Sequence, residues 1–301
     1  MRVLVTGGNG FIGRWVVDRL TDLGHEPIVF DHHVPGRHSA SWFGDVRDRT
    51  SINEACAHVD AVIHLAAVLG SAETVGNPYP AIETNIIGAV NVMEACLQYS
   101  LPMSMTSVGN AWLRADGAGT YTIVKECAAD LFQMYRNYRG LRGNLVRPTN
   151  AYGPGQSVWR GLGGTSSVRK ILPTFINQAL QGKPIEIYGD GEQVSDMCWV
   201  GDVAETLICA VLAAANGEQH PIAEVGPAEH LTVNQVAGRV QKEVELICGG
   251  SVAITHLPMR HGERSGHTIA DPETLKVYGI KQLPFSEGLI RTAAYYYSEN
   301  A

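Results

Sequence analysis

The feature that most constrains this chain is a glycine-rich turn directly after its first expected strand. Residues 6–13 read Thr-Gly-Gly-Asn-Gly-Phe-Ile-Gly, and they stand between the β-branched run Arg2–Val5 and an amphipathic stretch. Gly7 permits a sharp turn, Gly10 lets backbone N–H groups approach a pyrophosphate, and Gly13 allows a helix to pack closely on a sheet. The helix N-terminus adds a partial positive charge. A strand, turn and helix in this order predict a dinucleotide-binding site.

The first half of the chain alternates short β-branched runs with stretches of helical spacing. We expect strands at Arg2–Val5, Pro27–Phe30, Ala61–His64, Pro102–Thr106 and Asn144–Val146, and helices near 11–23, 50–57, 79–99 and 121–138. Such alternation predicts βαβ units and a parallel sheet with helices on both faces. The expected fold class is therefore α/β, with a Rossmann-type doubly wound parallel sheet.

The pattern changes after Pro148. A Gly-Pro-Gly turn and a Gly/Ser-rich loop at 160–167 precede an apolar helix near 171–181, a strand at Ile185–Tyr188 and mixed α/β segments. We expect a nucleotide-binding domain over residues 1–155 and a smaller C-terminal mixed α/β domain over 156–301 that mainly binds substrate. Some later segments are expected to return to the sheet.

Composition excludes several classes of protein. The 301 residues carry a net charge of −7 without a run of Lys or Arg, which argues against nucleic acid as the partner. The six cysteines are scattered without a CxxC pair, as expected of reduced thiols rather than of disulfides or a zinc site. The opening residues leave no room for a signal peptide, and no apolar run reaches the roughly 18 residues of a membrane span. We expect a cytoplasmic protein that is not bound to a membrane.

A carboxylate ends the second expected strand. Asp31 can accept hydrogen bonds from the adenosine ribose hydroxyls and would repel a 2′-phosphate, which favours NAD over NADP. Arg37 and the histidines His32, His33 and His38 weaken this preference slightly, because a cation softens the repulsion. No carboxylate spacing supports reading the histidines as a metal cluster. We interpret them as part of a solvated loop and expect no metal.

Two side chains at the start of the helix near 121–138 form a catalytic pair. Tyr121 and Lys125 have i, i+4 spacing and so share one helix face. An ammonium and a positive nicotinamide ring nearby would lower the pKa of a phenol and make it a usable base. Ser107, just past a strand, can hydrogen-bond the same substrate oxygen. Thr106 is the alternative hydroxyl.

With these residues the chain resembles the extended short-chain dehydrogenase/reductases, specifically the NAD-dependent nucleotide-sugar epimerase/dehydratase family. The resemblance runs from residue 1 to about residue 280. The motifs that carry it are TGGNGFIG (6–13), GDVRD (44–48), HLAA (64–67), YTIVK (121–125), RPTNAYGPGQ (147–156), IYGDGEQ (187–193) and RHGE (260–263).

The resemblance implies NAD as cofactor and a catalytic set of Ser107, Tyr121 and Lys125. It places Asp45 at the adenine amino group and Asn85 near the nicotinamide ribose. The further cofactor contacts that it implies are Gly7, Gly10, Phe11, Ile12, Gly13, Asp31, Val46, Leu65, Ala66, Ala67, Tyr121 and Lys125.

For the substrate, the resemblance implies a sugar carried by a nucleotide. Ser107 would contact the reacting hydroxyl, Asn150 the diphosphate or sugar, Tyr188 the nucleobase and Arg260 a phosphate. The resemblance also implies a homodimer, in which the helices near 79–99 and 121–138 form an intermolecular four-helix bundle.

Three departures from the family pattern bear on function. Ser107 is followed by Val108-Gly109, where dehydratases carry an Asp-Glu pair and decarboxylating relatives a glutamate. Ser195 stands where the family usually has an arginine that grips the diphosphate, and Arg160, Arg169 or Lys170 are possible replacements. The third is the short stretch from Ser107 to Tyr121, which is rich in Gly and Ala and would leave the active site more open. Trp112 lies in it and is an equal candidate for walling the sugar pocket and for packing the loop.

The sequence therefore predicts a nucleotide-sugar 4-epimerase. Such an enzyme needs only Tyr, Lys, a Ser or Thr hydroxyl and tightly held NAD. The alternative enzyme is an NAD-dependent dehydrogenase or reductase of a keto-sugar or another small alcohol, which the missing arginine favours. A non-enzymatic NAD sensor is the third interpretation, and the intact catalytic residues argue against it.

Overall fold

The computed structural model describes the chain except residues 34–40, 110, 112–117, 228, 261–265 and 301. Within the described part, seven parallel strands form one sheet in the order β10-β6-β5-β4-β1-β2-β3. These strands are β1 (Arg2–Thr6), β2 (Glu26–Asp31), β3 (Ser41–Phe43), β4 (Ala61–His64), β5 (Met103–Thr106), β6 (Gly143–Pro148) and β10 (Ala223–Val225). The order turns at β1, with strands added on both sides of it. This confirms the predicted Rossmann-type sheet.

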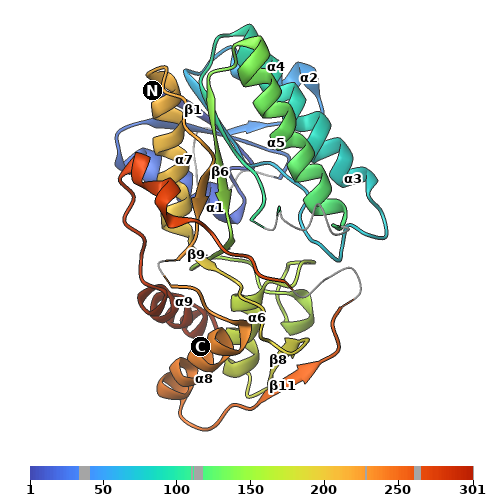
Figure 1. Ribbon diagram of the computed structural model, residues 1–301, viewed down its shortest axis with the longest axis vertical. Coiled ribbons are helices and arrows are strands. Elements are labelled where there is room, and N and C mark those ends of the chain that lie inside the picture. The colour runs from blue at the N-terminus through green and yellow to red at the C-terminus, as the bar shows by residue number, and fades with distance from the viewer. Residues whose placement is uncertain (34–40, 110, 112–117, 228, 261–265, 301) are drawn as a thin grey trace.

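Helices cover both faces of the sheet (Figure 1). On one face lie α1 (Phe11–Asp22) and α7 (Val200–Ala215), whose apolar side chains form one core with β1 and β4. On the other face, α2 (Arg49–Cys56), α4 (Ala89–Gln98) and α5 (Thr120–Arg139) form a second core around Met93 and Phe132. Burial of both faces explains why the central strands are apolar without alternation.

The helical stretch expected near 79–99 is not one regular helix. It comprises α3 (Tyr79–Ile82), a π-helical turn at Glu83–Gly88 and then α4. The π-turn contains Asn85, which is buried. The Asn85 amide donates to the Val68 carbonyl at 2.9 Å and accepts from the Val68 N–H at 2.8 Å. A π-turn inside a helix often marks a functional site, and this one ties the helix to a loop after β4.

A second lobe lies at the carboxyl end of the sheet (Figure 1). Its core joins α6 (Ile171–Leu180), α8 (Val233–Cys248) and α9 (Phe285–Asn300) to the parallel pair β8 (Ile185–Tyr188) and β11 (Ile254–Leu257). A second parallel pair, β7 (Asn150–Tyr152) and β9 (Met197–Trp199), connects the lobes. Short 3₁₀ helices occur at Arg160–Leu162 and Pro272–Tyr278.

Two segments from the second half of the chain belong to the large sheet. β10 pairs with β6, and α7 packs against α1 and the central strands. The strand β3 was not expected, because its three residues alternate between exposed and partly buried and have no apolar run. Its pairing with β2 is a tertiary contact that local sequence does not encode. Among the described residues, no helix combines the length and apolarity that a membrane crossing requires.

Candidate active site

A single cavity of 960 Å³ runs along the carboxyl edge of the sheet and on towards the second lobe. Its wall includes the first glycine turn, the ends of β2, β4 and β5, the start of α5 and the segment after β6. The predicted site residues that line it are Gly7, Gly10, Phe11, Ile12, Gly13, Asp31, Asp45, Val46, Leu65, Ala66, Ala67, Ser107, Tyr121, Lys125 and Asn150. In open α/β sheets, ligands bind at this edge beside the point where the strand order turns.

The glycine turn has the geometry that a dinucleotide requires. Gly7 has a φ of +69°, and a methyl group there would lie 2.8 Å from the Ala66 nitrogen. A methyl group on Gly13 would lie 2.3 Å from the Gly7 carbonyl oxygen, so Gly13 lets α1 begin against the turn itself. Gly10 caps α1 without a side-chain hydrogen bond. The first N–H groups of α1 are therefore available to a phosphate on the cavity side.

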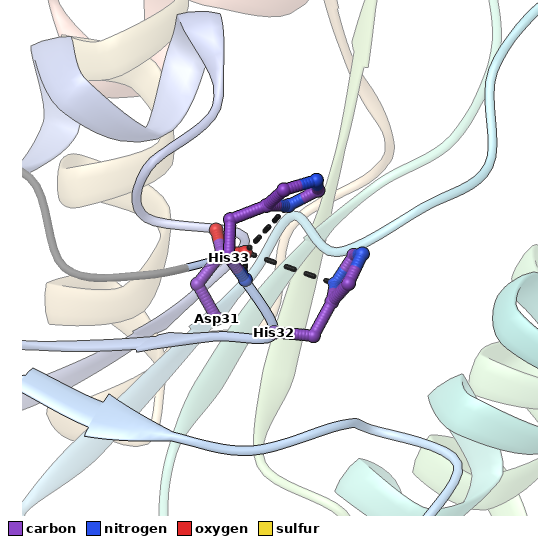
Figure 2. Close-up of side chains that lie close together, drawn as sticks. All are labelled: Asp31, His32 and His33. Atoms are coloured by element: carbon purple, nitrogen blue, oxygen red, sulfur yellow. Dashed lines mark hydrogen bonds and ion pairs between the residues drawn. The ribbon is translucent and has the colours of Figure 1, made fainter.

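Asp31 is buried at the end of β2 and accepts two backbone hydrogen bonds. The Asn9 N–H donates to its Oδ2 at 3.0 Å, and the His33 N–H donates to its Oδ1 at 3.0 Å. Figure 2 shows the rings of His32 and His33 beside the same carboxylate, with Nδ1 atoms 3.7 and 3.3 Å from Oδ1. The orientation of the carboxylate at the cavity wall is thereby fixed, and its contact with the ribose hydroxyls stays a prediction.

One ligand atom from each of Asp31, His32 and His33 lies within 4.8 Å of the others, which is a spacing that a metal ion could use. The sequence interpretation found no carboxylate for these histidines, and the structure supplies Asp31. Because this carboxylate faces the cavity and already accepts backbone hydrogen bonds, we assign the cluster to the cofactor site. Metal binding stays untested. Arg37 and His38 lie outside the described residues.

Asp45 lines the cavity next to an arginine that the sequence analysis did not single out. Arg47 donates to both oxygens of Asp45, with its Nη2 2.6 Å from Oδ2, and also reaches Glu83 at 3.3 Å. This guanidinium holds the pKa of the Asp45 carboxyl below its usual range. The signal was present in GDVRD, since Arg47 is its fourth residue.

The ends of β1 and β4 are joined by a buried hydrogen-bond cluster. The Thr6 hydroxyl lies 2.7 Å from His64 Nδ1 and accepts from the N–H groups of Leu65 and Ala66 at 3.1 and 3.3 Å. Burial and the Lys125 charge lower the pKa of His64 to about 3. His64 is thus neutral at physiological pH and has a hydrogen-bond partner in Thr6.

Tyr121 and Lys125 both reach the cavity from the first turns of α5. The Lys125 Nζ donates to the Thr106 hydroxyl at 3.3 Å, and burial lowers the pKa of this lysine to about 8. Burial raises the pKa of Tyr121 to about 12. The phenol of the protein alone is therefore a weaker acid than free tyrosine. The lowering that the sequence predicts depends on the positive charge of the bound dinucleotide.

Ser107 and Thr106 both line the cavity at the end of β5. The Ser107 hydroxyl donates to Glu126 Oε1, and Glu126 in turn faces Arg147. Sequence reasoning missed Glu126, because a carboxylate next to a catalytic lysine in a helix gives no indication of which strand it will face. The contact spans two elements and is set by how α5 rotates against the sheet.

The substrate side of the cavity contains Asn150 and Lys170. The Asn150 amide donates to the Ser195 hydroxyl at 2.9 Å and to the Asp196 carbonyl at 3.1 Å. Of the three cations considered as replacements at Ser195, Lys170 is the one that lines this cavity. Arg169 is instead held by Glu186 at 2.8 Å, and its charge is already paired.

Tyr188 and Arg260 lie together but outside this cavity. Arg169 donates to the Tyr188 hydroxyl at 2.6 Å, and the guanidinium carbons of Arg169 and Arg260 lie 4.9 and 5.3 Å from the Tyr188 ring centre. Arg260 also lies 3.9 Å from Glu73. The structure therefore places Tyr188 and Arg260 outside the cavity that Tyr121 and Asn150 both line. Asn85 also stays out of the cavity wall, and its amide is hydrogen-bonded to the backbone of Val68, which lines the cavity. Trp112 lies outside the described residues.

The chain was compared with known proteins. Residues 3–226 match the model of the NAD dependent epimerase/dehydratase family. A UDP-N-acetyl-alpha-D-glucosaminuronate decarboxylase of Bacillus cytotoxicus is 29% identical over 85% of this chain and 83% of its own length.

Two solved structures extend the comparison. A UDP-glucose 4-epimerase of Thermotoga maritima, solved with UDP-glucose, superposes with a TM-score of 0.85 at 25% identity and 100% coverage of both chains. A UDP-glucose 4-epimerase of Thermus thermophilus, solved with NAD, gives a TM-score of 0.79 at 26% identity and 99% coverage of both.

The glycine turn, the uncapped start of α1 and the Asp31 carboxylate fit a dinucleotide, and the family match covers all three. The cofactor is therefore NAD. The chain belongs to the NAD-dependent epimerase/dehydratase family and is an NAD-dependent enzyme.

Proposed function

We propose that this enzyme is a nucleotide-sugar 4-epimerase. One observation carries the proposal: a phenol, a lysine and a serine hydroxyl line the same cavity as the glycine turn that suits a dinucleotide. The match to two UDP-glucose 4-epimerase structures over nearly the whole chain supports it. So does Asn150, which lies in the same cavity on the side of the second lobe.

Each catalytic side chain has a specific task. Tyr121 takes the proton of the sugar hydroxyl at C4 and later returns it. Lys125 is held by Thr106 at 3.3 Å, one helical turn from Tyr121. Its charge favours the phenolate together with the positive charge of the bound dinucleotide. Ser107 fixes the position of the same oxygen. NAD would be held by the glycine turn and Asp31 and would supply reversible hydride transfer at C4.

The distribution of carboxylates favours epimerisation over dehydration or decarboxylation. Among the described residues that line the cavity, the carboxylates are Asp31 and Asp45. Both lie beyond β4 and β1 from Ser107, at the adenosine end. Removal of water or carbon dioxide next to the reacting carbon needs an acid or base at the catalytic end. This separates the proposal from the activity of the B. cytotoxicus decarboxylase.

A net dehydrogenase or reductase is the second candidate, and Ser195 is the observation that favours it. An arginine in that position would give a charge-assisted phosphate contact, and the serine instead accepts a hydrogen bond from Asn150. Lys170 answers this objection in part, because it brings one positive charge to the wall of the cavity that Asn150 also lines.

Turnover with a panel of nucleotide sugars distinguishes the two candidates. A 4-epimerase interconverts the two C4 epimers and leaves the absorbance at 340 nm unchanged over many turnovers, because the cofactor is regenerated. A dehydrogenase gives a steady change at 340 nm in proportion to product. Steady accumulation of NADH with a 4-keto product would replace the epimerase assignment by the dehydrogenase.

We also propose that the enzyme is a homodimer formed through α3, the π-turn, α4 and α5. Exposed apolar side chains on these segments are Tyr79, Ile82, Ile87, Ile123, Met134 and Tyr138. A second copy would cover such a face with a four-helix arrangement. Light scattering should give twice the chain mass, and Ile87→Arg should shift the measured mass towards one chain mass.

We propose a cytoplasmic location, which suits the six free cysteines.

A further inference from the structure

A carboxylate stands behind the proposed catalytic hydroxyl. Glu126 follows Lys125 on α5, and only 8% of it is exposed. Its Oε1 accepts the hydroxyl hydrogen of Ser107. Its Oε2 lies 3.4 Å from Nη2 of Arg147 on β6. The proposed acid–base and hydride-transfer steps assign no task to Glu126.

Arg147 makes the burial of this charge tolerable. Its other terminal nitrogen, Nη1, lies 3.0 Å from Oε1 of Glu224 on β10. The guanidinium thus bridges two carboxylates on different elements. A buried carboxylate is costly unless it is paired and hydrogen-bonded, and Glu126 has both kinds of partner. An ion pair with Arg147 therefore fixes the carboxylate against the back of Ser107.

This contact determines how Ser107 faces the cavity. A serine hydroxyl has one proton and two lone pairs. With the proton directed to Glu126, the lone pairs can accept a hydrogen bond from a donor in the cavity, such as the sugar hydroxyl before its proton passes to Tyr121. Ser107 lines the cavity, whereas Glu126 does not. The carboxylate can therefore influence a bound substrate only through the serine and through electrostatics.

The second influence of Glu126 is on its neighbour Lys125. Burial lowers the pKa of Lys125 to about 8, and the negative charge of Glu126 opposes that change. The other groups that face this pair are Arg147 on β6, Thr106 on β5 and His64 on β4. Among the four groups named here, Glu126 carries the negative charge that stabilises the Lys125 ammonium.

We propose that Glu126 is a positioning residue of the hydride-transfer site, which orients the Ser107 hydroxyl and keeps the Lys125 ammonium charged. The proposal rests on the 4-epimerase assignment for its kinetic test. It differs from that assignment in its residue and in its mechanism, since Glu126 contacts neither substrate nor cofactor in this arrangement.

The kinetic test compares Glu126→Gln and Glu126→Ala with the matched control Glu224→Gln. Glu224 binds the same arginine but lies on the far side of it from Ser107. Loss of a hydrogen bond to a charged group predicts a fall in kcat of about tenfold or more for Glu126→Ala. The KM and the affinity for NAD should stay within about twofold. Glu224→Gln should leave kcat within about twofold of wild type.

A double-mutant cycle with Ser107→Ala tests whether Glu126 acts through the serine. The loss of kcat caused by Glu126→Ala should be at least about fivefold smaller when Ser107 is already alanine. Equal losses in both backgrounds, or an effect of Glu224→Gln as large as that of Glu126→Gln, would overturn the proposal. Thermal melts of each variant separate these effects from loss of folding.

A readout without substrate is the titration of the Lys125 side-chain nitrogen by ¹⁵N NMR in the NAD-bound enzyme. Its signal is assigned by its disappearance in Lys125→Met. Glu126→Gln should move the titration midpoint to lower pH, and Glu224→Gln should not move it. An unmoved midpoint in Glu126→Gln would contradict the proposal. If the wild-type enzyme turned over no nucleotide sugar, the proposed function would fail, and this titration would still decide the role of Glu126.

Discussion

The two ends of the cavity differ in how they are built. At the cofactor end, Gly7 and Gly13 bring β1, α1 and the β4 loop so close that a methyl group would clash with backbone atoms. At the substrate end, Asn150, Lys170 and Thr268 come from three separate segments of the second lobe and its connections. The cofactor end is built from backbone atoms that pack closely together, whereas the substrate end is lined by side chains from separate segments.

This difference explains why one end is common to a family and the other is particular to a protein. A backbone cradle binds the pyrophosphate shared by all dinucleotides, and few residue types can form it. Side chains on separate segments can be exchanged one at a time, as Ser195 shows by its hydrogen bond to Asn150 in place of an arginine. Substrate choice is therefore expected to depend on the second lobe.

Tyr121→Phe should have the largest effect, because it removes the acid–base group at the junction of the two ends. General acid–base catalysis is worth about a hundredfold to ten-thousandfold, so kcat should fall by that range while NAD still binds. Steady-state kinetics with parallel NAD titration measures both. A fall of less than about tenfold would place the proton transfer elsewhere.

Gly13→Ala should damage the cofactor end alone. A methyl group 2.3 Å from the Gly7 carbonyl oxygen forces the turn to shift. If the full overpacking cost of about 1–3 kcal/mol falls on the bound state, NAD binding weakens by roughly fivefold to 150-fold. Isothermal titration measures this. Gly238→Ala is the control, since Gly238 lies within α8 and a methyl group there meets no atom within 4 Å. Equal NAD affinity in both variants would show that the cradle tolerates side chains.

Lys170→Ala should affect only the substrate end. Loss of a charged phosphate contact predicts a rise of about tenfold in the KM for a nucleotide sugar, with NAD affinity unchanged. Lys183→Ala is the matched control, because Lys183 is exposed beyond α6 and bonds Gln181. If both variants bind substrate alike, Lys170 does not replace the missing arginine.

Asp202 gives a smaller, pH-dependent effect at the joint between the lobes. It lies in the first turn of α7 and accepts the N–H of Leu283 at 2.9 Å, just before α9. Burial raises its pKa from 3.8 to about 6. The folded state thus holds this proton more tightly than the unfolded state, so its stability falls as pH rises from about 4 to 6.

Asp202→Asn should remove this loss of stability at higher pH, because the asparagine amide stays neutral. We expect a higher Tm than wild type at pH 8, by about 2 °C or more, and no difference at pH 4. Calorimetry at both pH values tests this, with the exposed Glu54→Gln as a control for net charge. A lower Tm at pH 8 would mean that the ionised carboxylate stabilises the joint.

The sequence predicted most of the cofactor end and less of the substrate end. The turn at Gly7 and the strand–helix order around it are local properties, so they could be read from neighbouring residues. The contact of Glu126 with Ser107 joins α5 to the end of β5, and the separation of Tyr188 from the cavity depends on how Arg169 packs. Both follow from tertiary packing. The sequence did not predict the edge strand β3 or the π-turn at Asn85, because both also depend on tertiary packing.

The central claim is that Tyr121 and the cofactor end act on one carbon of a sugar held by the substrate end. The direct measurement uses a nucleotide sugar with deuterium at C4 and the NAD-bound enzyme, with mass analysis of the recovered sugars. We predict that the epimerised product keeps its deuterium at C4, because the hydride leaves and returns within one closed site. Epimerised product that has lost the label to solvent would contradict the account.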